Sequence, residues 1–167
     1  MYQVKTILVP VDFSDLSRAA ISAAIQLGAQ NRSDDLRIIA LHVRHNLDKE
    51  LQQQIIENPD DHSLGEDMER DEKSLHAAFE LEYSRLEEGG RKVEPVPMTP
   101  MVTGGKWVDV ALQTIEDEEV DVIVAATHGG KGGLRGFFFG SDTERLVHHS
   151  TCSVWVVKPK GFPYLKN

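Results

Sequence analysis

The feature of this sequence that most constrains its fold is a regular alternation of short apolar runs with longer segments of helical periodicity. The apolar runs lie at residues 5–11, 36–43, 120–126 and 153–157, and a weaker one at 93–102 carries three prolines. Continuous apolar runs of this length are typical of strands that are buried on both faces of a parallel sheet. Strands that alternate with helices are joined by right-handed crossovers. The sequence therefore predicts an α/β fold: a doubly wound, mainly parallel, five-stranded sheet with helices on both faces.

The segments between the apolar runs predict four helices. They cover residues 18–29, 68–88, 109–118 and 141–149. Ser14 is a good N-cap for the first helix, and Gly89 with Gly90 is expected to end the second. Because proline has no backbone N–H to donate to a sheet ladder, the run at 93–102 is expected to form an edge strand.

The length of the chain fits a single domain that spans residues 1–167. Within it, residues 44–71 are polar, become strongly acidic toward their end, and contain a proline and a glycine. This composition predicts a mobile excursion from the domain, with a short helix at Asp48–Glu57.

The charge and the hydropathy of the chain argue against several classes of function. The net charge of −9 disfavours non-specific binding of DNA or RNA, which depends on clustered Lys and Arg. No run approaches the roughly 18 apolar residues that a membrane span requires, and the amino-terminal residues resemble a first strand rather than a signal peptide. The single cysteine, Cys152, allows no intrachain disulfide and favours a reducing compartment. We therefore expect a cytoplasmic protein with no nucleic-acid partner and no membrane span.

The strongest chemical signal is the glycine-rich segment Thr127–Ser141, which follows a buried apolar run and opens a helix. Its glycines at 129, 130, 132, 133, 136 and 140 permit positive φ and a close approach of backbone N–H groups to a ligand. The helix start adds N–H donors and a dipole that favours an anion, while Ser141 and Thr143 add hydroxyl groups. Two interpretations remain open, a polyphosphate cradle or a flexible turn without a ligand. Neither the Walker A loop nor the dinucleotide fingerprint matches this segment.

Asp12 is the second candidate. Ligands of doubly wound sheets bind beyond the carboxyl ends of the strands, which singles out the turns at Pro10–Ser14 and Val43–Asn46 beside the glycine-rich segment. A carboxylate in the first of these turns can accept hydrogen bonds from a ribose or an adenine edge, or it can cap the following helix, and both roles are compatible. His42 lies within a predicted strand and is interpreted as a core residue. The seven histidines show no spacing typical of metal ligands.

Three parts of the sequence together resemble the universal stress protein family over almost the full length of the chain. They are Ile7–Ser14, Ala40–Val43, and Thr127–Glu144 followed by Ser153–Val157. The last part is the most specific, because nucleotide-binding members of that family carry glycines at set spacing before a Gly-Ser or Gly-Thr pair. The resemblance implies an adenine-nucleotide alpha-hydrolase-like fold and a nucleotide-binding stress or signalling module.

The resemblance also implies a site for ATP, or for ADP or AMP, with or without Mg²⁺. The nucleotide-binding residues that it implies are Pro10, Val11, Asp12, Val43, Ala126, Thr127, Gly129, Gly130, Gly140, Ser141, Asp142 and Thr143. In this assignment the first strand contacts adenine and ribose, Val43 binds adenine through its backbone, and the glycine-rich loop holds ribose and phosphates. No metal ligand is expected from the protein alone. The sequence shows no nucleophile with its base and no cationic finger, so the chain is expected to be at most a slow ATPase.

The glycine-rich loop departs from the family pattern at the first glycine. Depending on the alignment, Thr127 or Ala126 stands where the pattern has that glycine. The departure leaves an alternative function open, a family member that binds no nucleotide and acts as a protein-interaction dimer. In either case the resemblance implies a homodimer through the last strand, where Val154 and Val156 alternate with Trp155.

Overall fold

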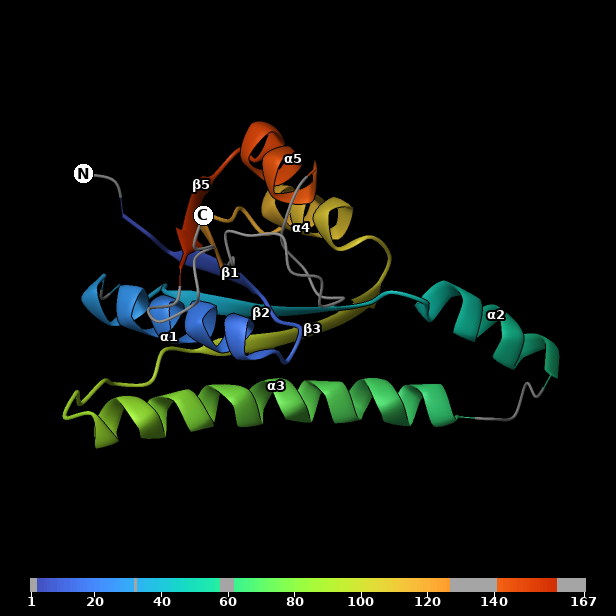
Figure 1. The fold of residues 1–167 in the computed structure, drawn as a ribbon, viewed down its shortest axis with the longest axis horizontal. Helices are drawn as coiled ribbons and strands as arrows, with labels where there is room; N and C mark the ends of the chain where they lie inside the picture. The colour runs from blue at the N-terminus through green and yellow to red at the C-terminus, as the bar shows by residue number, and fades with distance from the viewer. Residues whose placement is uncertain (1–2, 32, 58–61, 127–140, 159–167) are drawn as a thin grey trace, which may run out of the picture.

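The computed structural model describes residues 3–31, 33–57, 62–126 and 141–158. Its sheet has five parallel strands in the order β3-β2-β1-β4-β5 (Figure 1). The strands are β1 (Thr6–Pro10), β2 (Arg37–Arg44), β3 (Met98–Gly104), β4 (Val122–Ala126) and β5 (Ser153–Val157). The helices are α1 (Asp15–Gln30), α2 (Leu47–Glu57), α3 (Ser63–Glu88), α4 (Trp107–Asp117) and α5 (Ser141–His149). The predicted fold class is confirmed.

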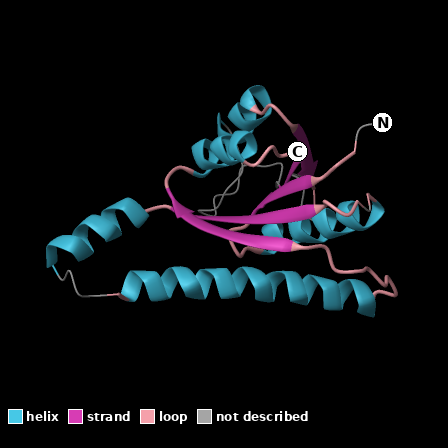
Figure 2. Cartoon of the chain, turned by 180° about the vertical axis from the view of Figure 1, so that it is seen from behind, coloured by secondary structure: helices cyan, strands magenta, loops and turns pink. Residues whose placement is uncertain are grey.

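Helices cover both faces of the sheet, α1 and α3 on one face and α4 and α5 on the other (Figures 1 and 2). The side chains of β1 show this division. Ile7 and Val9 pack with α1 and α3, whereas Leu8 packs with α4 and α5. Every residue of β1 and of β4 is buried. Burial on two faces explains why these strands are continuous apolar runs without polar alternation.

The segment expected as an excursion, residues 44–71, is largely helical. The predicted helix at Asp48–Glu57 corresponds to α2, but the next helix, α3, begins at Ser63 rather than at residue 68. Long-range contacts join this part of α3 to the end of β2. Arg44, the last residue of β2, pairs with Asp71 at 3.0 Å and Asp67 at 3.9 Å on α3. Figure 1 shows α2 and the amino-terminal part of α3 extending beyond the sheet.

β3 lies at one edge of the sheet, as its prolines predicted, but it begins only at Met98 and runs on to Gly104. The Ile38 N–H donates to the Pro97 carbonyl at 2.8 Å. Backbone polar groups of successive strand residues point to opposite sides, so the even-numbered residues of β3 face away from β2. Pro100 is one of them, and its missing N–H therefore falls on the outer edge, where no ladder bond is lost.

β5 lies at the opposite edge, with the bounds that the sequence predicted. The Ser153 N–H donates to the Asp121 carbonyl at 3.1 Å, on the side of β4. By the same alternation, Val154 and Val156 direct their N–H and C=O groups outward. Trp155, between them, is 42% exposed.

No helix in the described ranges combines the length and the apolar character that a membrane-crossing helix needs.

Candidate functional site

The topology creates one switch point, between β1 and β4. These strands are neighbours in the sheet, yet the chain leaves β1 toward β2 and leaves β4 toward β5. The helix after β1 packs on one face and the helix after β4 on the other. The two connections therefore diverge beyond the carboxyl ends of β1 and β4, and in such sheets ligands bind in the crevice between the diverging connections.

The first turn of this crevice is built around Asp12. Its Oδ1 accepts hydrogen bonds from the Ser14 N–H at 3.0 Å and the Ser14 hydroxyl at 2.5 Å. Ser14 in turn accepts from the Ser17 N–H and caps α1, as the sequence predicted. Asp12 therefore supports the cap instead of capping the helix itself. Among the described residues, both bonds that Asp12 accepts use Oδ1.

Phe13, between these two residues, has a backbone φ of 61°. A bulky residue in this left-handed region is strained by roughly 1–2 kcal/mol, and such residues cluster at functional sites. The sequence offered no signal for this conformation, because left-handed positions normally carry Gly or Asn. In the same turn the Asp12 carboxylate folds back onto Ser14.

Val11 directly follows β1, and Val43 lies on the neighbouring strand β2 at the same end of the sheet. The Val11 N–H donates to the Leu41 carbonyl at 2.8 Å, so the backbone of Leu41 faces β1. Val43 is two residues further along β2 and directs its N–H and C=O to the same side. Since β1 ends at Pro10, opposite Leu41, those groups of Val43 face the space past the end of β1.

The second side of the crevice is the amino terminus of α5, which begins at Ser141. Leu146 is fully buried, and Arg145 forms an ion pair with Asp109 of α4, so α5 is anchored to its neighbour. Ala126, the last residue of β4, is buried. Thr127, Gly129, Gly130 and Gly140 lie outside the described residues.

Two residues in the first turn of α5 have informative side chains. The Asp142 carboxylate accepts a hydrogen bond from the Trp107 indole N–H at 3.2 Å, so it is tied to α4. Thr143 Oγ1 is buried and has no hydrogen-bond partner among the described residues. A buried hydroxyl without a partner is costly, and such an atom indicates room for a ligand group or a loop group.

The structure also brings in residues that the sequence analysis did not assign to the site. His42 contacts the Val11 carbonyl through Nδ1 at 2.8 Å, and its ring packs against that of Phe13. Trp107 holds Asp142. Both pairs join residues that are distant in sequence, so no local motif marks them. Among the described residues there is no cluster of three or more His, Cys, Asp or Glu side chains that could hold a metal ion.

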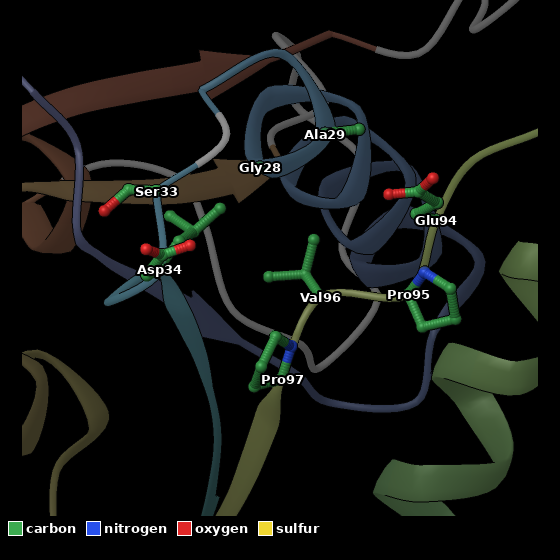
Figure 3. A pocket seen from close by; sticks show the side chains of 9 residues that line it. Gly28, Ala29, Ser33, Asp34, Glu94, Pro95, Val96 and Pro97 are labelled. Carbon is green, nitrogen blue, oxygen red and sulfur yellow. The ribbon is translucent and has the colours of Figure 1, made fainter.

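A pocket of about 350 Å³ lies at the other end of the sheet (Figure 3). It is bounded by the end of α1, the segment before β2 and the segment before β3. Its charged lining residues are Asp34 and Glu94, and its floor includes Val96. The two carboxylates disfavour a phosphate ligand, which separates this pocket from the crevice at the switch point.

The sequence matches the universal stress protein family over residues 3–158. The chain belongs to the universal stress protein family. A similar member is universal stress protein MJ0577 of Methanocaldococcus jannaschii, which is 29% identical over 94% of this chain and 96% of that protein. The structure of MJ0577 covers 96% of this chain and 99% of its own, with a TM-score of 0.59 and 24% identity.

Two further solved structures share the universal stress protein fold and contain a nucleotide. A universal stress protein in complex with cAMP has a TM-score of 0.59 at 15% identity, covering 94% of this chain and 98% of its own. A family protein from Arabidopsis thaliana with AMP bound has a TM-score of 0.52 at 20% identity, covering 98% of this chain and 97% of its own. At these identities the likeness shows the fold alone.

Proposed function

We propose that this universal stress protein binds an adenine nucleotide, with ATP and Mg²⁺ as the favoured ligand, at the switch point between β1 and β4. The observation that carries the proposal is a convergence at one end of the sheet. The Asp12 turn, the backbone groups of Val43 and the amino terminus of α5 all lie at the carboxyl ends of neighbouring strands. The relatives with cAMP or AMP bound support an adenine nucleotide as the class of ligand.

Each part of the crevice suits a different part of the nucleotide. An adenine edge presents donors and acceptors side by side, and the backbone of Val43 presents one N–H and one C=O past the end of β1. The Asp12 Oδ2 atom suits a ribose hydroxyl, because Oδ1 is the oxygen that holds Ser14. The start of α5 suits the phosphates through its N–H groups, its dipole and the buried Thr143 hydroxyl.

The Asp142 carboxylate next to this phosphate position calls for an explanation, since like charges repel. Its hydrogen bond to the Trp107 indole ties the carboxylate to α4. This attachment supports a phosphate at the helix start by keeping the carboxylate engaged elsewhere. Mg²⁺ bound with the phosphates would reduce the repulsion further. We propose no catalytic role beyond slow hydrolysis.

The test is a measurement of nucleotide-dependent stability on extensively dialysed protein. With ATP and Mg²⁺ at about 100 times the Kd, we expect the free energy of unfolding to rise by about 2.7 kcal/mol. GTP should give a smaller rise. Asp12→Ala should weaken ATP binding roughly tenfold by removing the ribose acceptor. Asp15→Ala is the matched control, because Asp15 is 87% exposed and pairs with Arg18 on the surface. Absence of any rise with wild-type protein would show that the nucleotide proposal is wrong.

We also propose that the protein forms a homodimer through β5, with Val154, Trp155 and Val156 at the interface. The outward-facing backbone groups of this strand and the exposed Trp155 support it. A second copy related by a two-fold axis would pair with the same strand in antiparallel orientation. If the dimer forms and no nucleotide binds, the alternative function stands, a protein-interaction dimer of the same family.

A further inference from the structure

We propose that His42 is a positioning residue of the nucleotide site, which orients the peptide between Val11 and Asp12 toward the ligand. The proposal rests on the proposed function and names the side chain that shapes the first turn of that site. His42 belongs to β2, whereas the turn that it holds follows β1.

The hydrogen bond determines which ring nitrogen carries a proton. His42 Nδ1 lies 2.8 Å from the Val11 carbonyl oxygen. A carbonyl can only accept, so Nδ1 must be the donor. Both the neutral Nδ1–H tautomer and the charged imidazolium have a proton at that position. The contact with Val11 therefore persists whether or not the ring is charged.

The bond sets the direction of the next backbone donor. The described residues contain no cis peptide bonds, and in a trans peptide the C=O and the N–H point in opposite directions. The Val11 N–H and C=O are both directed to β2, to Leu41 and His42 respectively. The Asp12 N–H is therefore directed to the opposite side, that of β4, where the crevice opens.

The ring of His42 is itself held on three sides. Its side chain is only 16% exposed, and the Phe13 ring lies against it at a centroid distance of 4.7 Å. Its Nε2 lies 3.8 Å from Asp71 Oδ2 on α3. Arg44 binds the same carboxylate at 3.0 Å, so a cation also faces this position. Asp71, itself bound by Arg44, therefore faces the ring edge from α3.

The arrangement differs from that of a histidine that only fills a core. The partner of His42 is the first loop residue after β1, not a group within its own strand. Two consecutive bonds tie Val11 to β2, and the strained Phe13 closes over the ring that makes the second one. His42 thus extends the contacts with β2 beyond the last residue of β1, into the loop that we propose contacts the nucleotide.

The experiment compares His42→Leu, which cannot donate, with His42→Gln, whose side-chain amide can donate to the Val11 carbonyl. We expect His42→Leu to raise the Kd for ATP and Mg²⁺ by roughly five- to tenfold, the range of one lost hydrogen bond. His42→Gln should stay within about threefold of wild type. His76→Leu is the control for loss of a histidine, since His76 is exposed on α3.

Nuclear magnetic resonance of ¹⁵N-labelled protein provides a readout that a purely structural role would not move. The ligand-free protein should show a proton on His42 Nδ1. The Asp12 amide signal should shift on addition of ATP and Mg²⁺ in wild type and in His42→Gln, and much less in His42→Leu. If His42→Leu does not fold, the protonated nitrogen and the Asp12 shift in wild type decide the question.

The possible failures can be told apart. Equal Kd values for wild type and His42→Leu would overturn the role of His42 and leave the proposed function intact. A proton found on Nε2 alone would do the same, as would binding by His42→Gln that is as weak as that of His42→Leu. Wild-type protein that binds no adenine nucleotide would overturn the proposed function, and this inference with it.

Discussion

The two edges of the sheet are built in opposite ways. At the β3 edge, Pro100 places its missing N–H on the outside, and Tyr83 of α3 holds the segment that leads into the strand. At the β5 edge, Val154 and Val156 direct complete sets of backbone groups outward beside the exposed Trp155. An edge without protection is a template for pairing with another chain. The comparison indicates that the fold protects one edge and leaves the other open.

The difference follows from how the chain reaches each edge. β3 is entered through Pro95 and Pro97, which favour extended backbone and cannot donate to a ladder. The Val96 N–H between them donates to the Tyr83 hydroxyl at 2.8 Å. β5 follows α5 after a short turn and consists of residues with high strand propensity. Its sequence is suited to pairing on both sides.

The largest effect is expected from Val156→Pro, which removes an outward N–H at the β5 edge. In a two-fold dimer the same bond is lost twice, and the ring crowds the approaching strand, so the dimer Kd should rise roughly 100-fold. The bonds between β4 and β5 are unaffected, because Val156 faces outward. Sedimentation equilibrium measures the change. Val156→Ala, which keeps the N–H, is the control, and an unchanged dimer in Val156→Pro would break the comparison.

A smaller effect is expected from Tyr83→Phe, which removes the acceptor for the Val96 N–H beside the β3 edge. Val96 is 9% exposed, so its N–H would be left largely without water, at a cost of about 1–2 kcal/mol. Chemical denaturation measures the loss. Ser84→Ala, on the exposed side of α3, is the control.

The same residue gives the β3 edge a dependence on alkaline pH. Burial raises the pKa of the Tyr83 hydroxyl above its ordinary value, with the nearby Glu80 contributing in the same direction. A raised pKa in the folded state means that stability is fully present below the unfolded pKa of about 10 and is lost as pH rises through the folded pKa. Tyr83→Phe should lack this alkaline loss. Parallel losses in both proteins would contradict the assignment.

The smallest effect is expected from Pro100→Val, which restores an outward N–H on β3. The loss of proline should lower the free energy of unfolding by less than about 1 kcal/mol, through a more flexible unfolded chain. The newly opened edge should increase self-association at high protein concentration, which light scattering detects. If Pro100→Val associates no more than wild type, the proline is not what protects this edge.

Much of this fold follows from local pattern. The bounds of α5 and β5 were predicted to the residue, and Ser14 was identified as the N-cap of α1. Periodicity and capping depend on neighbours in sequence, so they can be recognised without the tertiary structure. The start of α3 at Ser63 was not predicted in this way, and the ion pairs of Asp67 and Asp71 with Arg44 of β2 depend on the tertiary structure.

The candidate site divides along the same line. The sequence by itself determined the βα alternation, the switch point, and the placement of Asp12, Val43 and the start of α5 at one end of the sheet. Only the tertiary structure decided how these residues are held: His42 on the Val11 carbonyl, and Trp107 on Asp142. The physical reason is that such bonds depend on strand register and helix packing. Both are set by the burial of the whole core and not by any segment of the chain.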